Sequence, residues 1–101
     1  MKIPDKVKIG GQTLDVKRVD KVQDDNRNTD GLIIYGKDLI EIRDDLQGDY
    51  ADFVFLHELF HGIYEHCGFE QNENEIDRLA RALHMVIKDN PDIFKEGETN
   101  A

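Results

Sequence analysis

The stretch DYADFVFLHELFHGIYEHCG, residues 49–68, decides the fold because it predicts a long helix in the middle of the chain. From Tyr50 to His61 no glycine or proline interrupts it, and apolar residues run through its whole length. Asp49 is a suitable N-cap residue, and Gly68 stands where a C-cap glycine belongs. We therefore expect a helix over about residues 49–67.

The segments before this helix have the alternation of β-strands. In KVKIGGQTLDVKRV, residues 6–19, apolar and polar residues alternate on both sides of Gly10-Gly11, which predicts a hairpin. A second pair of strands is expected at 32–35 and 39–43, joined by turn residues. Between the pairs, the polar stretch DKVQDDNRNTDG, residues 20–31, is typical of a surface loop.

A second helix is predicted over about residues 74–89. One apolar stripe at helical spacing runs along it, formed by Ile76, Leu79, Ala80, Leu83, Val86 and Ile87. Pro91 ends it by disfavouring the helical conformation in Asn90, and Ile93 and Phe94 are expected to make a last core contact. Strands over about 6–43 followed by two helices predict an α+β fold, with antiparallel strands packed on the helices.

Length and composition restrict the class of protein. A chain of 101 residues suits a single domain, here 1–101, and the formal charge of −9 argues against a nucleic acid or an anionic membrane as partner. The partner is expected to be a protein or peptide. Cys67 is the only cysteine, and the first residues lack the apolar run of a secretion signal, so we expect a soluble cytoplasmic protein.

The five residues HELFH, 57–61, have the spacing of a metal site. His57 and His61 lie one helical turn apart on one face, so both imidazoles can reach a single ion. Glu58 projects roughly 100° round the helix from His57, where it can hold a water molecule and act as a base. Zinc suits two neutral imidazoles and a carboxylate, with one position open for water.

The third protein ligand must come from elsewhere in the chain. Cys67 is better interpreted as a small buried residue, and His66 as a solvated one. The second helix opens with three acidic residues, Glu73, Glu75 and Asp77. If its apolar stripe faces the first helix, the two glutamates border the packed face and Asp77 turns away. Periodicity alone does not choose between Glu73 and Glu75.

The chain resembles the compact ImmA/IrrE-type metallopeptidases, which are zincins with an HExxH helix and a glutamate ligand. The resemblance covers roughly residues 31–91 and is closest to the short versions found in bacteriophages and mobile elements. It depends on HELFH and on EIDRLARAL, residues 75–83, although Ile76 and Asp77 replace the usual alanine and asparagine of the family's second motif.

The resemblance implies a small zincin-like domain that holds one zinc ion per chain. Its register assigns the metal ligands to His57, His61 and Glu75, and the general base to Glu58. It also implies an edge strand that pairs with an extended substrate, for which residues 39–43 are the candidate. The alternative is that this segment is an interior strand of the sheet.

Three hypotheses for function follow. The first is a zinc-dependent endopeptidase that cleaves a protein substrate, with Glu58 as the base that activates water. The second is a phage-encoded binding or inhibitor module that keeps the zinc site without significant catalysis. The third is a metal that mainly stabilises a small domain, since metal binding adds directly to folding free energy.

Overall fold

A four-stranded mixed sheet and two helices form the protein, and the computed structural model describes residues 1–95. The strands of this sheet lie in the order β1 (Lys6–Ile9), β2 (Gln12–Val19), β6 (Leu39–Arg43) and β5 (Gly31–Ile34). A smaller sheet contains β3 (Val22–Asp24) and β4 (Arg27–Thr29), and a 3-10 turn, η1 (Tyr35–Lys37), separates β5 from β6. The helices are α1 (Gly48–Cys67) and α2 (Glu73–Asp89), so the predicted α+β class is confirmed.

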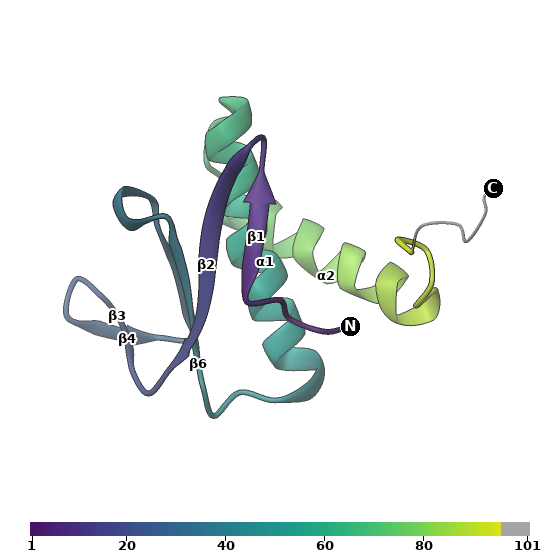
Figure 1. The fold of residues 1–101 in the computed structure, drawn as a ribbon, viewed down its shortest axis with the longest axis horizontal. Coiled ribbons are helices and arrows are strands. Elements are labelled where there is room, and N and C mark those ends of the chain that lie inside the picture. The colour runs from purple at the N-terminus through teal and green to yellow at the C-terminus, as the bar shows by residue number, and fades with distance from the viewer. Residues whose placement is uncertain (96–101) are drawn as a thin grey trace.

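Helix α1 lies between the sheet and α2. It contacts β1, β5 and β6 on one side and α2 on the other, and Figure 1 shows α2 running away from the sheet. Alternate residues of β6 point toward α1, and the side chains of Ile40 and Ile42 are fully buried. They join a core formed with Leu14, Val16, Ile33, Leu46, Ala51, Val54, Phe55, Leu56 and Ala80.

Both predicted strand pairs are present. β1 and β2 form an antiparallel hairpin whose turn residues, Gly10 and Gly11, have φ of +56° and +93°. β5 and β6 are also antiparallel, and Asp38 takes the left-handed conformation between them. The two pairs join through parallel pairing of β2 with β6. The edge strands are therefore β1 and β5. Residues 39–43 form an interior strand, so the alternative is confirmed and the edge candidate is wrong.

Residues 20–31 are not an irregular loop, which corrects the prediction. They contain the β3–β4 hairpin, whose two-residue turn is formed by Asp25 and Asn26 with φ of +50° and +65°. Aspartate and asparagine tolerate this conformation better than most residues, so the composition that suggested a loop also suits a tight hairpin turn. Val22 is almost completely buried and attaches the hairpin to the rest of the domain.

The ends of the helices differ slightly from the predictions. α1 begins at Gly48, and Gln47 precedes it as N-cap, so Asp49 lies in the first turn instead of capping the helix. The C-cap at Gly68 is confirmed, with φ of +72° and hydrogen bonds from its N–H to the carbonyls of Tyr64 and Glu65. α2 begins one residue earlier than expected, at Glu73, because the side chain of Asn72 caps it by accepting a hydrogen bond from the Glu75 N–H.

The apolar stripe of α2 is only partly covered. Ile76 and Ala80 are fully buried against α1, whereas Leu79 remains 39% exposed. A helix that packs on a single neighbouring helix can bury only a narrow part of its surface. The expected core contact of Ile93 and Phe94 is wrong, since these side chains are 52% and 69% exposed.

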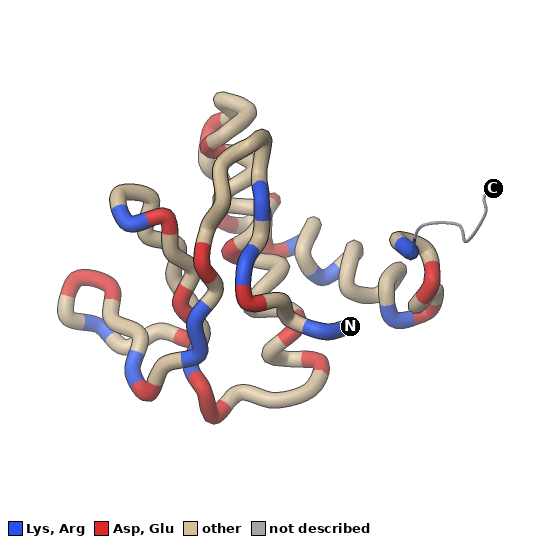
Figure 2. Tube along the Cα trace, in the orientation of Figure 1, with Lys and Arg blue, Asp and Glu red and all other residues tan. Residues whose placement is uncertain are grey.

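Charged residues occur along the whole described chain (Figure 2). Acidic residues gather at the turn of the β3–β4 hairpin and in the segment that leads into α1, whereas lysine and arginine residues are frequent on β1 and β2. Within residues 1–95, neither helix combines the length and the apolar character that crossing a membrane requires.

Candidate metal centre

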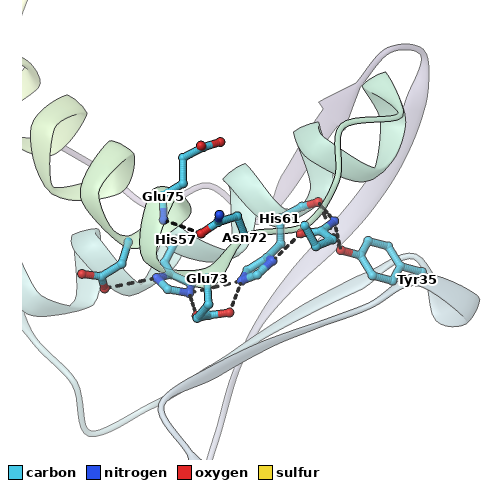
Figure 3. A network of polar contacts seen from close by, with 8 residues as sticks. Tyr35, His57, His61, Asn72, Glu73 and Glu75 are labelled. Atoms are coloured by element: carbon cyan, nitrogen blue, oxygen red, sulfur yellow. Dashed lines mark hydrogen bonds and ion pairs between the residues drawn. The ribbon is translucent and has the colours of Figure 1, made fainter.

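Two histidines of α1 and the first residue of α2 converge on one point (Figure 3). The Nε2 atoms of His57 and His61 are 3.2 Å apart. The Glu73 carboxylate spans them, with Oε1 2.6 Å from His57 Nε2 and Oε2 3.1 Å from His61 Nε2. One donor atom from each residue lies within 4.8 Å of the other two, so the three side chains can hold a metal ion.

The turn between the helices positions this group. Gly68 ends α1 in a left-handed conformation, and the connector of residues 69–72 returns the chain toward the histidine face. The Asn72 cap then fixes the first turn of α2. Glu73 consequently begins α2 beside the imidazoles, where its carboxylate reaches both of them.

The structure does not bring Glu75 to the histidines. Its carboxylate accepts a hydrogen bond from the Tyr64 hydroxyl, and Figure 3 shows it on the side of α2 opposite to Glu73. Two residues correspond to about 200° of rotation on a helix, so Glu73 and Glu75 cannot face the same partner. A sequence signal did exist: Asn72 and Glu75 have capping-box spacing, which sets Glu73 as the first helical residue.

Glu58 is the one buried charged side chain among residues 1–95, at 8% exposure. It lines the same cleft as the two histidines and accepts a backbone hydrogen bond from Ile33 of β5. Burial raises the pKa of Glu58 above its ordinary value, while the nearby imidazoles of His57 and His61 act in the opposite direction. The predicted base therefore lies beside the metal-binding group, in a setting suited to proton transfer.

Two further residues contact the outer nitrogens of the histidines. Gln71 Oε1 is 2.8 Å from His61 Nδ1, and Asp77 Oδ1 is 3.7 Å from His57 Nδ1. The sequence-based expectation that Asp77 turns away from α1 is wrong, because α2 packs in a different rotation from the one that its apolar stripe implied. No spacing rule in the sequence identified Gln71, which lies in the connector.

His57 and His61 line a cleft of about 550 Å³. Its walls come from the β5 edge, the middle of α1, the start of α2 and the β3–β4 hairpin, and its lining includes Gly31, Leu32, Ile33, Tyr35, Tyr50 and Phe53. The strand edge at this cleft belongs to β5 and not to residues 39–43, the candidate that the resemblance implied.

A second group with metal-binding donors lies at the other end of α1. Asp49, Asp52 and His84 offer ligand atoms within 4.8 Å of one another. Lys88 Nζ is 2.5 Å from Asp49 and lowers the pKa of that carboxyl through its hydrogen bond, and the N-terminal amine is 3.6 Å from Asp52. These cations already neutralise the carboxylates, so this group is an ion-pair network between α1 and α2.

Comparisons with models of protein families, with curated protein sequences and with solved structures gave no significant match.

Proposed function

We propose that the protein is a zinc-dependent metallopeptidase that hydrolyses peptide bonds in a protein substrate. The observation that carries this proposal is the convergence of His57 Nε2, His61 Nε2 and the Glu73 carboxylate beside the buried Glu58. Two imidazoles and one carboxylate are a donor set that catalytic zinc sites use, with a further position left for water or substrate. The donor chemistry thus fits zinc. Glu73 takes the role of third ligand, which the family resemblance assigned to Glu75.

The residues around the zinc ligands have distinct tasks in this mechanism. When bound, zinc would supply a Lewis acid that activates a water molecule and polarises the substrate carbonyl. The Glu58 carboxylate takes a proton from the attacking water and delivers it to the departing amide nitrogen. Glu58 lines the same cleft as the proposed ligands, which places its carboxylate where that water would be held.

Substrate binding is assigned to the edge of β5. An extended peptide can add to an exposed sheet edge through main-chain hydrogen bonds, and the residues of β5 line the cleft that contains Glu58. Tyr35 and Tyr50 also line this cleft, where their hydroxyls donate to the His61 carbonyl oxygen and to the Asp30 carboxylate. Burial raises the pKa of Tyr35, so its hydroxyl stays protonated. A single cysteine, Cys67, suits a reducing cytoplasm as the compartment.

Metal analysis and peptide hydrolysis test the proposal together. Protein purified without chelator should contain about one zinc per chain, and His57→Ala should lose it. In a mixture of unstructured peptides, the wild type should cleave and Glu58→Gln should not, although Glu58→Gln keeps its zinc. Glu65→Gln, at an exposed position on the same helix, is the matched control and should keep both properties.

Two outcomes would contradict the peptidase. Zinc retained in full by His57→Ala would exclude the proposed ligands. The second outcome is that the wild type binds zinc but cleaves no peptide, and that Glu58→Gln has the same biological effect as the wild type. This result would favour the binding or inhibitor module.

A further inference from the structure

The amide of Gln71 contacts His61 at two places. Its Oε1 lies 2.8 Å from His61 Nδ1, and its Nε2 donates to the His61 carbonyl oxygen at 3.1 Å. The same carbonyl oxygen accepts a hydrogen bond from the Tyr35 hydroxyl, which is 3.4 Å from Gln71 Nε2. Figure 3 shows this network on the side of His61 away from Glu73. It joins η1, α1 and the connector between the helices.

These contacts determine which ring nitrogen of His61 carries the proton. A carbonyl oxygen only accepts hydrogen bonds, so the end of Gln71 that faces it must be the NH₂ group. The other end is then the amide oxygen, which also only accepts. The His61 Nδ1 atom opposite must therefore carry a hydrogen, and in the neutral ring this leaves the lone pair on Nε2.

That lone pair points to the proposed metal site. His61 Nε2 is the atom that lies 3.1 Å from Glu73 and 3.2 Å from His57 Nε2. A hydrogen bond on the outer nitrogen also prevents the imidazole from rotating about its side-chain bonds. Gln71 thus sets both the tautomer and the orientation that metal binding requires.

We propose that Gln71 is a positioning residue that holds His61 in the Nδ1–H tautomer, with Nε2 ready to bind the metal ion. This inference rests on the proposed function, because it assigns His61 as a ligand. Gln71 acts through His61 and has no role in proton transfer. The backbone carbonyl of His61 orients the Gln71 amide by accepting a hydrogen bond from its NH₂ group. The arrangement therefore does not depend on a charged partner.

Zinc affinity of two Gln71 variants, measured by competition with a chromophoric chelator, tests the inference. Gln71→Met keeps the length of the side chain and removes the acceptor, and it should weaken zinc binding by roughly 10- to 100-fold. Gln71→Glu keeps an acceptor opposite Nδ1 and loses the bond to the His61 carbonyl, so it should bind zinc more tightly than Gln71→Met. Gln47→Ala, at an exposed position before α1, should match the wild type.

Long-range ¹H–¹⁵N spectra of the zinc-free protein give a second measurement. The Nδ1–H fraction of His61 should be lower in Gln71→Met than in the wild type when both spectra are recorded under the same mildly alkaline conditions. Thermal unfolding of the zinc-free variants should be unchanged, since Gln71 is exposed.

The two proposals fail in different ways. If Gln71→Met and Gln71→Glu both bound zinc as tightly as the wild type, the positioning role would be overturned. The metallopeptidase proposal would be unaffected. An equal loss in both variants, or an unchanged tautomer fraction in Gln71→Met, would also overturn it. Absence of zinc from the wild type would instead contradict the metal site itself.

Discussion

At the scale of single residues, the candidate metal site depends on the Glu73 carboxylate. It is 69% exposed as a side chain, yet both of its oxygens lie within 3.1 Å of an imidazole nitrogen. Glu75, only two residues later, has the same charge and a different partner, the Tyr64 hydroxyl. The hydrogen bond to Glu75 raises the pKa of Tyr64, so that phenol remains a donor and holds the carboxylate away from the histidines.

Exchanging each of these glutamates for glutamine separates their roles. Glu73→Gln removes the charged ligand and should weaken zinc binding by more than the roughly 10- to 100-fold that loss of a supporting residue costs. Glu75→Gln should leave zinc affinity close to that of the wild type. Isothermal titration of zinc into metal-free protein measures both. The reverse order would return the third ligand to Glu75.

At the scale of elements, the start of α2 must be set correctly for Glu73 to reach α1. The Asn72 side chain accepts a hydrogen bond from the Glu75 N–H at 3.0 Å and thereby fixes the first helical turn. Asn72→Ala should destabilise the protein by about 1 kcal/mol, the usual cost of losing an N-cap. Urea unfolding measures this change, with Asn74→Ala in the same exposed turn as the control. Equal stability of the two variants would show that the cap is not needed.

The approach of β5 to α1 depends on a glycine. A Cβ added at Gly31 would lie 2.6 Å from Val54 Cγ1 and 3.3 Å from Glu58 Cγ, so the strand and the helix would have to separate. Gly31→Ala should therefore reduce stability, by roughly the 1–3 kcal/mol of an overpacked core. It should also lower peptide hydrolysis more than zinc affinity, because β5 shifts relative to Glu58, whereas the proposed ligands all lie on the two helices and keep their mutual arrangement.

A second glycine substitution is the control for this experiment. At Gly36 an added Cβ would meet no atom of residues 1–95 within 4 Å. Gly36→Ala should leave thermal unfolding and hydrolysis close to wild type. If Gly31→Ala behaved in the same way, the close packing of β5 on α1 would have no bearing on the position of Glu58.

For the whole molecule, zinc should contribute to stability because its ligands come from both helices. A ligand that binds only the folded state at 100 times its Kd adds about 2.7 kcal/mol. For a domain of this size, that corresponds to a rise in Tm on the order of 10 °C. Differential scanning fluorimetry with zinc or with a chelator measures the shift. His57→Ala should show no zinc-dependent shift, and an equal shift in that variant would indicate binding elsewhere.

Local patterns in the sequence predicted much of the fold. The Gly10-Gly11 turn, the second strand pair and the helix around HELFH all depend on residues that are close in the chain, and the structure contains each of them. The hairpin in residues 20–31 was missed because Asp25 and Asn26 suit both a loop and a two-residue turn. Burial of Val22, which favours the hairpin, comes from contacts outside this segment.

The sequence by itself determined the class of the fold and the half of the candidate site that lies on one helix. The spacing of His57 and His61 follows from helix geometry, which needs no knowledge of other elements. Only the tertiary structure decided that β2 pairs with β6, which leaves β5 at the edge, and that α2 turns Glu73 toward the histidines. Strand order and helix rotation are set by packing between segments distant in the chain, and a local pattern of residues does not encode them.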